Sequence, residues 1–172
     1  EIRSSLTPVD IGADAGDFVF RYPSTTKLLC PGSSFNIVSD ITTGASFQWQ
    51  ADTGTGFANI QDNIYYSGTN TNTLHVTNIP SSWYGYLYRC SINGAFSNAF
   101  NIKFTNQWLG TVSSEWENPA NWSCGILPDG NTDVVIASGS VVLGSNGVCR
   151  SISISSTASF TVATGFSLTI TH

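Results

Sequence analysis

The clearest set of possible metal ligands is a run of oxygen-bearing side chains in one polar turn. Asp129, Asn131 and Asp133 place carboxylate or amide oxygens at alternate positions. This spacing resembles the start of a calcium-binding loop. Val134 stands at the sixth position, where such a loop needs glycine, and no Glu closes the loop. The segment therefore favours a turn before a strand, with calcium as the alternative and no other cofactor indicated.

Two carboxylates and two histidines are the remaining candidates for catalysis. Glu115 and Glu117 lie two positions apart, so on an extended chain they share a face and could form the acid pair of a glycosidase. The sequence around His75 and His172 does not indicate the nucleophile and orienting partner that a catalytic base needs. His75 alternates with apolar neighbours and is expected to face solvent. We therefore predict that the chain is not an enzyme.

Aromatic residues gather in two stretches of the sequence. The first contains Tyr65, Tyr66, Trp83, Tyr84 and Tyr86, and the second contains Trp108, Trp116 and Trp122. Such rings could stack on the apolar faces of a sugar, but small domains also need their large apolar surface for the core. We predict core positions for Trp49, Tyr88, Trp116 and Trp122.

The candidates for ligand-binding aromatics lie in the first stretch. Trp83 belongs to the polar turn between Pro80 and Gly85, which is expected at the surface. Tyr84 follows it directly, and Tyr65 with Tyr66 forms the other half of the stretch. We predict that any sugar site of this chain uses these four side chains.

Four cysteines could form disulfides: Cys30, Cys90, Cys124 and Cys149. They allow three connectivities. Pairing within each half of the chain, Cys30 with Cys90 and Cys124 with Cys149, fits a two-domain protein of an oxidising compartment. Four buried free thiols are the alternative.

Composition narrows the class of protein. Charged residues make up 10% of the chain, against about a quarter in ordinary globular domains. The net charge is -5 with only six Lys and Arg, so nucleic-acid binding is not expected.

The sequence has no apolar run of membrane-spanning length. It begins at Glu1 without Met or a signal peptide, as expected for a piece of a longer protein. The uncharged polar character favours an extracellular or outer-membrane surface location.

Short alternating runs of β-formers, separated by Gly, Asn, Asp and Ser, predict an all-β chain. Residues 1–27 are expected to be an N-terminal segment or first edge strand. Residues 28–105 carry enough short strands for a β-sandwich: 33–39, 46–50, 72–79, 86–92 and 99–104. Within them, Tyr88 stands two residues before Cys90, the spacing of a tyrosine corner in an Ig-like sandwich, with Trp49 on a central strand.

Residues 106–172 predict a second small β-domain with regular repeats. Units of Ser, apolar, Ser or Thr, apolar recur at eight-residue spacing from Ser151, Ser159 and Ser167. This period predicts the start of a β-solenoid or a regular meander. We expect the Trp-rich segment 115–130 to cap this stack, and the parent protein to continue past His172 because an open stack leaves an unpaired edge.

Residues 28–104 resemble the Ig-like repeats of large secreted and cell-surface proteins of Bacteroidetes. The matching motifs are Cys30-Pro-Gly32, Phe47-Gln-Trp49-Gln50, residues 52–57, Tyr66-Ser-Gly68, Asn72-Thr-Leu74, Gly85, Tyr88-Arg-Cys90 and Ser97-Asn98. One departure is that Cys30 precedes the strand in which the antibody-type cysteine lies. In the resembling repeats this early cysteine often pairs beyond strand F, where this chain has none, which leaves Cys90 as its partner within the domain.

The rest of the chain resembles a second Bacteroidetes surface-protein module. Its motifs are Trp108-Leu-Gly110, Ser113-Ser-Glu-Trp116, Asn118-Pro-Ala-Asn121-Trp122, Gly125, Pro128, residues 133–136 and Cys149-Arg-Ser-Ile152. The resemblance implies a location and an architecture but no reaction.

The function expected from these observations is a non-catalytic extracellular module of a larger surface or secreted protein, serving adhesion or as a structural spacer. Its partner would be a protein or glycan at the cell exterior, besides further domains of the same polypeptide. The alternative is a carbohydrate-binding module attached to a polysaccharide-degrading enzyme.

Overall fold

The computed structural model describes residues 29–38, 46–97 and 99–172, and within these ranges the chain is all-β. The N-terminal segment 1–27, the last residue of the first expected strand (Ser39) and Asn98 lie outside the described residues. Two short 3-10 helices, η1 (Ser81–Trp83) and η2 (Pro119–Asn121), interrupt the strands. No helix within the described ranges is long and apolar enough to span a membrane.

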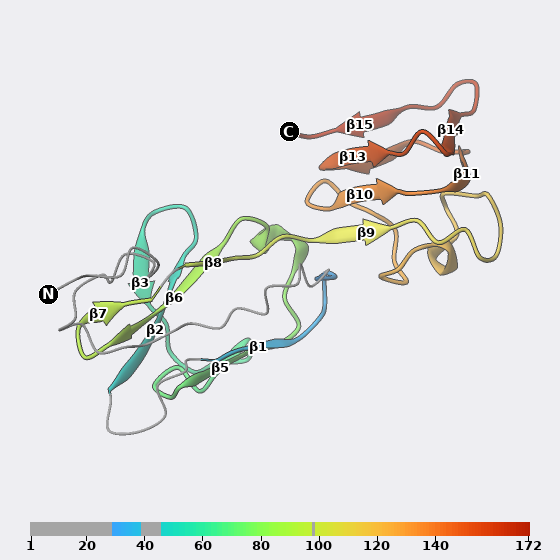
Figure 1. The fold of residues 1–172 in the computed structure, drawn as a ribbon. Helices are drawn as coiled ribbons and strands as arrows, with labels where there is room; N and C mark the ends of the chain where they lie inside the picture. Colours follow the sequence, from blue (N-terminus) through green and yellow to red (C-terminus); the bar gives the residue numbers. More distant parts are fainter. Residues whose placement is uncertain (1–28, 39–45, 98) are drawn as a thin grey trace, which may run out of the picture.

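The first module is a sandwich of two antiparallel sheets (Figure 1). One sheet has the order β1 (Phe35–Val38), β5 (Thr73–Val76), β4 (Tyr66–Ser67). The other has the order β3 (Phe57–Asn59), β2 (Phe47–Asp52), β6 (Leu87–Ile92), β7 (Ala95–Phe96), and β8 (Phe100–Asn101) also pairs with β6.

Alternation along the strands builds the sandwich core, because successive side chains point to opposite faces. On β1, Phe35 and Ile37 are buried while the residues between and after them are exposed. Trp49 on β2 lies opposite Cys90 on β6, and both are fully buried. The burial of Trp49 was predicted from the sequence and is confirmed.

A tyrosine pair connects the two sheets inside this core. The hydroxyl of Tyr88 on β6 lies 2.9 Å from the hydroxyl of Tyr66 on β4. Burial, followed by the contact with Tyr66, raises the pKa of Tyr88. The predicted core position of Tyr88 is confirmed, but its hydroxyl bonds a second tyrosine, whereas in a tyrosine corner it bonds a backbone group.

The second module is a parallel β-solenoid. Its strands are β9 (Thr105–Gln107), β10 (Asp133–Ile136), β11 (Gly139–Leu143), β12 (Gly147–Cys149), β13 (Ser151–Ile154), β14 (Ala158–Val162) and β15 (Leu168–Ile170). β10 pairs in parallel with β9 and β13, β11 with β14, and β12 with β15. A meander would pair consecutive strands antiparallel, so of the two architectures expected from the repeats the solenoid is the one formed.

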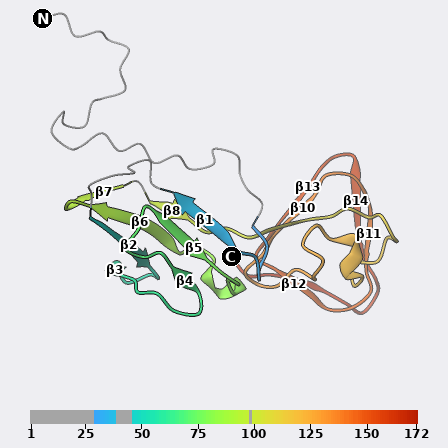
Figure 2. The same ribbon diagram turned by 90° about the horizontal axis from the view of Figure 1, so that it is seen from below.

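The solenoid therefore consists of stacked coils. We call β10, β11 and β12 the second coil, and β13, β14 and β15 the third coil; β9 and residues 108–132 form an irregular first coil. Viewed along the stack, the strands outline a triangle with one sheet on each side (Figure 2). The eight-residue units of the sequence are successive sides of the third coil rather than neighbours in one sheet.

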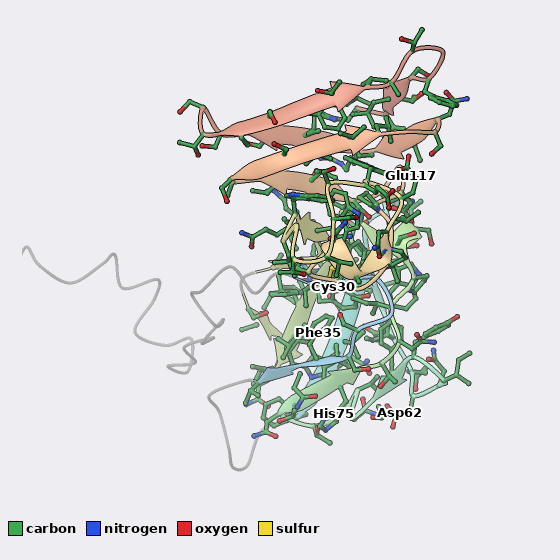
Figure 3. All side chains as sticks on the ribbon, turned by 90° about the vertical axis from the view of Figure 1, so that its right-hand side faces the viewer. Cys30, Phe35, Asp62, His75 and Glu117 are labelled. Atoms are coloured by element: carbon green, nitrogen blue, oxygen red, sulfur yellow. A yellow bond between two sulfur atoms is a disulfide. The ribbon has the colours of Figure 1, made fainter. Side chains whose placement is uncertain are left out.

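Each module has its own apolar core. The sandwich core ends at Phe104, and the solenoid core begins at Trp108. The second coil supplies Val134, Ile136, Val141, Leu143 and Cys149 to the solenoid core. The third coil lies on the side of the stack away from the sandwich (Figures 1 and 3).

Candidate functional site

Three of the four predicted ligand-binding aromatics come together on the sandwich. Trp83 on η1 stacks on Tyr66, with ring centroids 5.4 Å apart, and meets the edge of Tyr65 at 5.0 Å. Tyr86, which was outside the predicted set, stacks on Trp83 at 5.4 Å. Trp83 is half-buried and packs against the sandwich core, so it is less exposed than its polar turn indicates. We call Tyr65, Trp83 and Tyr86 the aromatic cluster.

Tyr84 turns away from this cluster to the junction with the solenoid. Its hydroxyl donates to Asp133 Oδ2 at 2.6 Å, and the guanidinium of Arg150 lies over its ring at 4.1 Å from the centroid. Burial and the hydrogen bond to the negatively charged Asp133 raise the pKa of Tyr84 to about 12. Tyr84 therefore joins the sandwich to the solenoid.

Asp133 is the polar centre of this junction. Its Oδ1 accepts hydrogen bonds from Arg150 Nη1 at 2.9 Å and from Ser151 Oγ at 2.5 Å. Burial raises the pKa of Asp133, but hydrogen bonds from Ser151, Tyr84 and Arg150 outweigh it and hold that pKa below the usual value. The carboxylate is thus held ionised against donors from both modules.

Asp129, which would be the first oxygen ligand of the alternative calcium loop, also accepts hydrogen bonds. Asp129 Oδ1 accepts from the backbone N of Asn131 at 3.0 Å and from Thr132 Oγ1 at 2.7 Å. Burial raises the pKa of Asp129, but hydrogen bonds from Ser81 of the sandwich and from Thr132 outweigh burial and hold that pKa below its usual value. The described part of the chain holds no group of three or more His, Cys, Asp or Glu suited to a metal ion. Asp129 and Asp133 therefore link this turn of the solenoid to the sandwich, through Ser81 and Tyr84.

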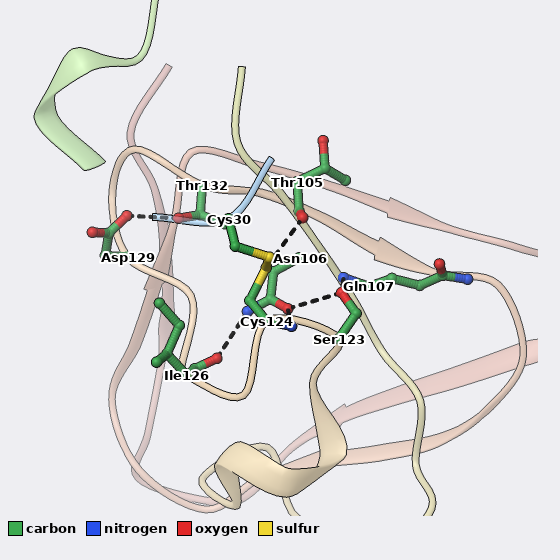
Figure 4. Close-up of a disulfide and its surroundings, with 9 residues drawn as sticks. All are labelled: Cys30, Thr105, Asn106, Gln107, Ser123, Cys124, Ile126, Asp129 and Thr132. Carbon is green, nitrogen blue, oxygen red and sulfur yellow. Dashed lines mark hydrogen bonds between the residues drawn. A yellow bond between two sulfur atoms is a disulfide. The ribbon is translucent and has the colours of Figure 1, made fainter. Parts of the chain in front are cut away.

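A disulfide crosses the same junction and overturns the expected pairing. Cys30 is bonded to Cys124, with Cα atoms 5.5 Å apart and a sequence separation of 94 (Figure 4). Cys90 and Cys149 are buried free thiols, each inside its own module. Pairing within the halves was wrong because Cys30 precedes the first strand of the sandwich and lies at its solenoid end, not in the core with Cys90 (Figure 3).

The backbone around the disulfide is held by a buried residue that sequence reasoning missed. Asn106 on β9 donates from Nδ2 to the carbonyl of Ile126 at 2.8 Å, and its Oδ1 accepts from the backbone N of Cys124 at 3.1 Å. The neighbouring Thr105 donates its backbone N–H to the carbonyl of Leu29 at 3.1 Å. Asn106 therefore fixes the segment that carries Cys124, although in the sequence it marked only a boundary.

An open hollow lies beside the junction. It is lined by Tyr84, Gly130, Asn131, Arg150, Thr171 and His172. The cation in it, Arg150, is already paired with Asp133. The hollow therefore presents no uncompensated charge from this arginine to a ligand.

The Trp-rich segment closes the first end of the solenoid. Trp122 meets Trp116 at 4.6 Å and Trp108 at 5.1 Å, in both cases edge to face. Its Nε1 donates to the carbonyl of Trp116 at 2.8 Å, and all three rings are buried. The predicted core positions of Trp116 and Trp122 are confirmed. Because the rings are buried and crossed, they form no flat surface on which a sugar could stack.

Asn121 is the second buried polar residue that organises this cap. Its Oδ1 accepts from the backbone N of Val112 and of Ser113, and its Nδ2 donates to Ser113 Oγ and to the carbonyl of Glu115. The side chain is fully buried. Although Asn121-Trp-Ser123 reads as a glycosylation sequon, the amide is committed to the fold.

The two candidate acids of the cap differ in their environments. Glu117 Oε1 accepts from the backbone N of Gly144 and from Ser145 Oγ, both at 2.8 Å. Burial raises the pKa of Glu117, but these hydrogen bonds outweigh it and lower the pKa below its usual value. Glu115 is exposed. Glu117 therefore ties the cap to the second coil.

His75 is exposed on β5, as its alternation predicted. Its Nδ1 lies 2.7 Å from Asn36 Oδ1 on the adjacent strand β1. This is a contact across two paired strands, not the triad that nucleophilic catalysis would need.

Comparison with known proteins adds one similarity, for the second module. A search of curated proteins and a search of solved structures each found no match. Residues 107–172 match a family model described as "Domain of unknown function (DUF8693)". The match starts at the last residue of β9 and takes in the tryptophan cap and the second and third coils. The solenoid with its cap is therefore similar to a family whose function is not defined.

Proposed function

We propose that this chain is a non-catalytic extracellular module of a larger surface or secreted protein, in which a β-sandwich and a β-solenoid are joined as one rigid spacer. The loops at its surface would contact a protein or glycan outside the cell. The observation that carries the proposal is the disulfide between Cys30 and Cys124, which joins the modules instead of stapling either one.

The disulfide bears on location as well as on rigidity. Disulfides persist in oxidising compartments and are rare in the cytosol of most organisms. The low charged fraction and the resemblance to Bacteroidetes surface proteins agree with an extracellular site. Both are supporting arguments for the location that we propose.

Rigidity follows from the number of independent links across the junction. Besides the disulfide, Tyr84 donates to Asp133, Arg150 lies over Tyr84, and Thr105 of β9 donates its backbone N–H to the carbonyl of Leu29. β9 continues directly from the sandwich into the solenoid sheet. Interfaces between domains of one chain otherwise allow relative motion by default. A junction held by a disulfide and several further contacts suits a module that keeps neighbouring parts of a protein at a fixed separation.

The alternative function, carbohydrate binding, has one feature in its favour. The aromatic cluster brings Tyr65, Trp83 and Tyr86 to the sandwich surface as half-buried rings. Trp83 already stacks on Tyr66 and Tyr86, so ring surface that a sugar could use is covered by the protein itself. For this reason we place the spacer function first.

Small-angle X-ray scattering of the oxidised chain tests the rigid spacer. We expect a single elongated particle whose distance distribution matches the arrangement in Figure 1. The paired substitution Cys30→Ser with Cys124→Ser should broaden that distribution, and treatment of the unsubstituted protein with a reductant should broaden it in the same way, with the oxidised protein as the control. Free relative motion of the two modules in the oxidised protein would contradict the proposal.

A glycan array with tryptophan-fluorescence titration separates the alternative. Binding that is lost in Trp83→Ala and kept in Trp122→Phe, a buried control, would favour a carbohydrate-binding module over the spacer.

A further inference from the structure

The apolar core of the solenoid is covered in the second coil and uncovered in the third. Residues in register occupy equivalent positions in the two coils: Ile136 with Ile154, Leu143 with Val162, and Cys149 with Ile170. The three second-coil residues are fully buried, whereas Ile154, Val162 and Ile170 are 43%, 38% and 48% exposed. The columns of core side chains thus reach the end of the stack without a layer above them.

The strand edges at this end are open too. Among the described strands, β13, β14 and β15 each stand last in their sheets, with a partner on one side only. Proteins usually protect such edges with charged side chains or proline. Residues 151–172 contain no Asp, Glu, Lys, Arg or Pro. Nothing in the sequence of this coil opposes the addition of another strand.

The opposite end of the same stack is closed. Trp108, Trp116 and Trp122 cover the core of the second coil there. A second copy of the chain could therefore bring only its own open end to this one. Related by a two-fold axis, the facing strands would run antiparallel, and the register that aligns core columns in parallel coils would be lost.

We propose that the open end of the third coil is an acceptor surface for one further β-coil. That coil lies parallel and in register on β13, β14 and β15, and consists of uncharged Ser or Thr residues alternating with aliphatic ones. The argument is continuity with the interface between the second and third coils, which has this pairing and this composition. It rests on strand pairing and exposure, independently of the proposed spacer function.

Fusing a copy of residues 152–172 after His172 tests the proposal directly. Ser151 starts the third coil. Because Cys149 lies in register with Ile170, His172 is the position that corresponds to Ser151 one coil further on. A copy of residues 152–172 placed after His172 therefore keeps the register. The fusion should raise the melting temperature by at least about 3 °C and reduce binding of an apolar dye. Backbone amides of β13 to β15 that face the open edge should exchange with solvent at least tenfold more slowly.

The matched control is a fusion of the same composition in scrambled order, which should change none of these values. In the fused protein, Ile154→Lys should remove the gain, although Ile154 is exposed in the unfused chain. If the ordered and scrambled fusions behave alike, the acceptor surface is refuted. A stable dimer of the unfused chain that Ile170→Lys dissociates would also overturn the proposal, in favour of a second copy.

Discussion

The two modules solve the problem of enclosing a β-core in opposite ways. The sandwich lays two antiparallel sheets face to face, so that its core is covered by its own strands. The solenoid stacks parallel coils and covers each layer only with the next, so its core needs a cap at each end. In this chain one end has a cap of three tryptophans, and the other is uncovered.

The junction is where the two designs meet, and it is polar where both cores are apolar. Tyr84, Asp133 and Arg150 make charged and hydrogen-bonded contacts there, beside the disulfide. A closed sandwich offers an end rather than a face to its neighbour, and hydrogen bonds at such an end fix orientation. The modules are thus linked by a disulfide and specific polar contacts, and each keeps a separate apolar core.

Removing the cap should have the largest effect on the solenoid. Trp122→Ala deletes a buried ring between two others and leaves the Trp116 carbonyl without its donor, and we expect a loss of about 3–5 kcal/mol. Chemical denaturation followed by tryptophan fluorescence measures it. Trp83→Ala in the half-buried aromatic cluster is the comparison, with a smaller loss expected. Equal losses would show that the buried cap contributes no more to stability than the half-buried aromatic cluster does.

The uncovered columns can be tested by a pair of identical substitutions in register. Ile136→Ala in the second coil should cost about 2–5 kcal/mol, since its side chain is fully buried. Ile154→Ala, its partner position in the third coil, should cost less than about 1 kcal/mol. Urea denaturation gives both values. A cost at Ile154 as large as at Ile136 would show that the third coil is already covered in solution.

Breaking the joint should cost less than breaking the cap. Cys30→Ser with Cys124→Ser removes a cross-link that closes a long loop of the unfolded chain, and we expect a loss of about 2–4 kcal/mol. Calorimetry should then show the two modules unfolding at more widely separated temperatures. Retention of one shared transition would indicate that the polar contacts alone couple them.

The smallest effect should come from the junction tyrosine, through pH. The folded pKa of Tyr84 is about 12 against an ordinary value of 10.0, so its neutral form is favoured by folding. Its contribution to stability is therefore complete below pH 10 and is lost as pH rises towards 12. Tyr84→Phe should cost about 1 kcal/mol at neutral pH and flatten this alkaline loss. An ultraviolet titration in which Tyr84→Phe removes no late-ionising tyrosinate would contradict the assignment.

The acid side of the same junction should behave in the opposite sense. The pKa of Asp133 is below its usual value, so its contribution is present above the unfolded pKa and is lost as pH falls through the folded one. Asp133→Asn should therefore weaken the dependence of stability on acid pH, measured by urea denaturation at several pH values. An unchanged dependence of stability on acid pH would show that ionised Asp133 does not stabilise the fold.

Local patterns were sufficient for the parts of the fold that depend on alternation. The strand predicted at 33–39 forms with Phe35 and Ile37 on its buried face, and the repeats after Ser151 form stacked short strands. The parallel arrangement of those strands could not be derived, because the same units also fit a meander. It depends on which strand each one meets after a full turn of the coil, which is a long-range property.

The candidate site was less predictable, since its partners are far apart in sequence. Tyr84 was grouped with Trp83 because they are neighbours, yet successive residues point apart, and Tyr84 reaches Asp133. Cys30 was paired within its own half, although its position before the first strand placed it at the end of the sandwich. Asn106 marked only a boundary in the sequence, because only the fold shows that it is buried.

The pairing of the cysteines tests the central claim most directly. Proteolysis of the unreduced protein with its thiols blocked, followed by mass spectrometry, identifies each linked pair. We expect one cross-linked peptide that joins Cys30 to Cys124, with Cys90 and Cys149 recovered as blocked thiols. Linkage of Cys30 to Cys90 and of Cys124 to Cys149 would contradict the joined modules, as would four free thiols.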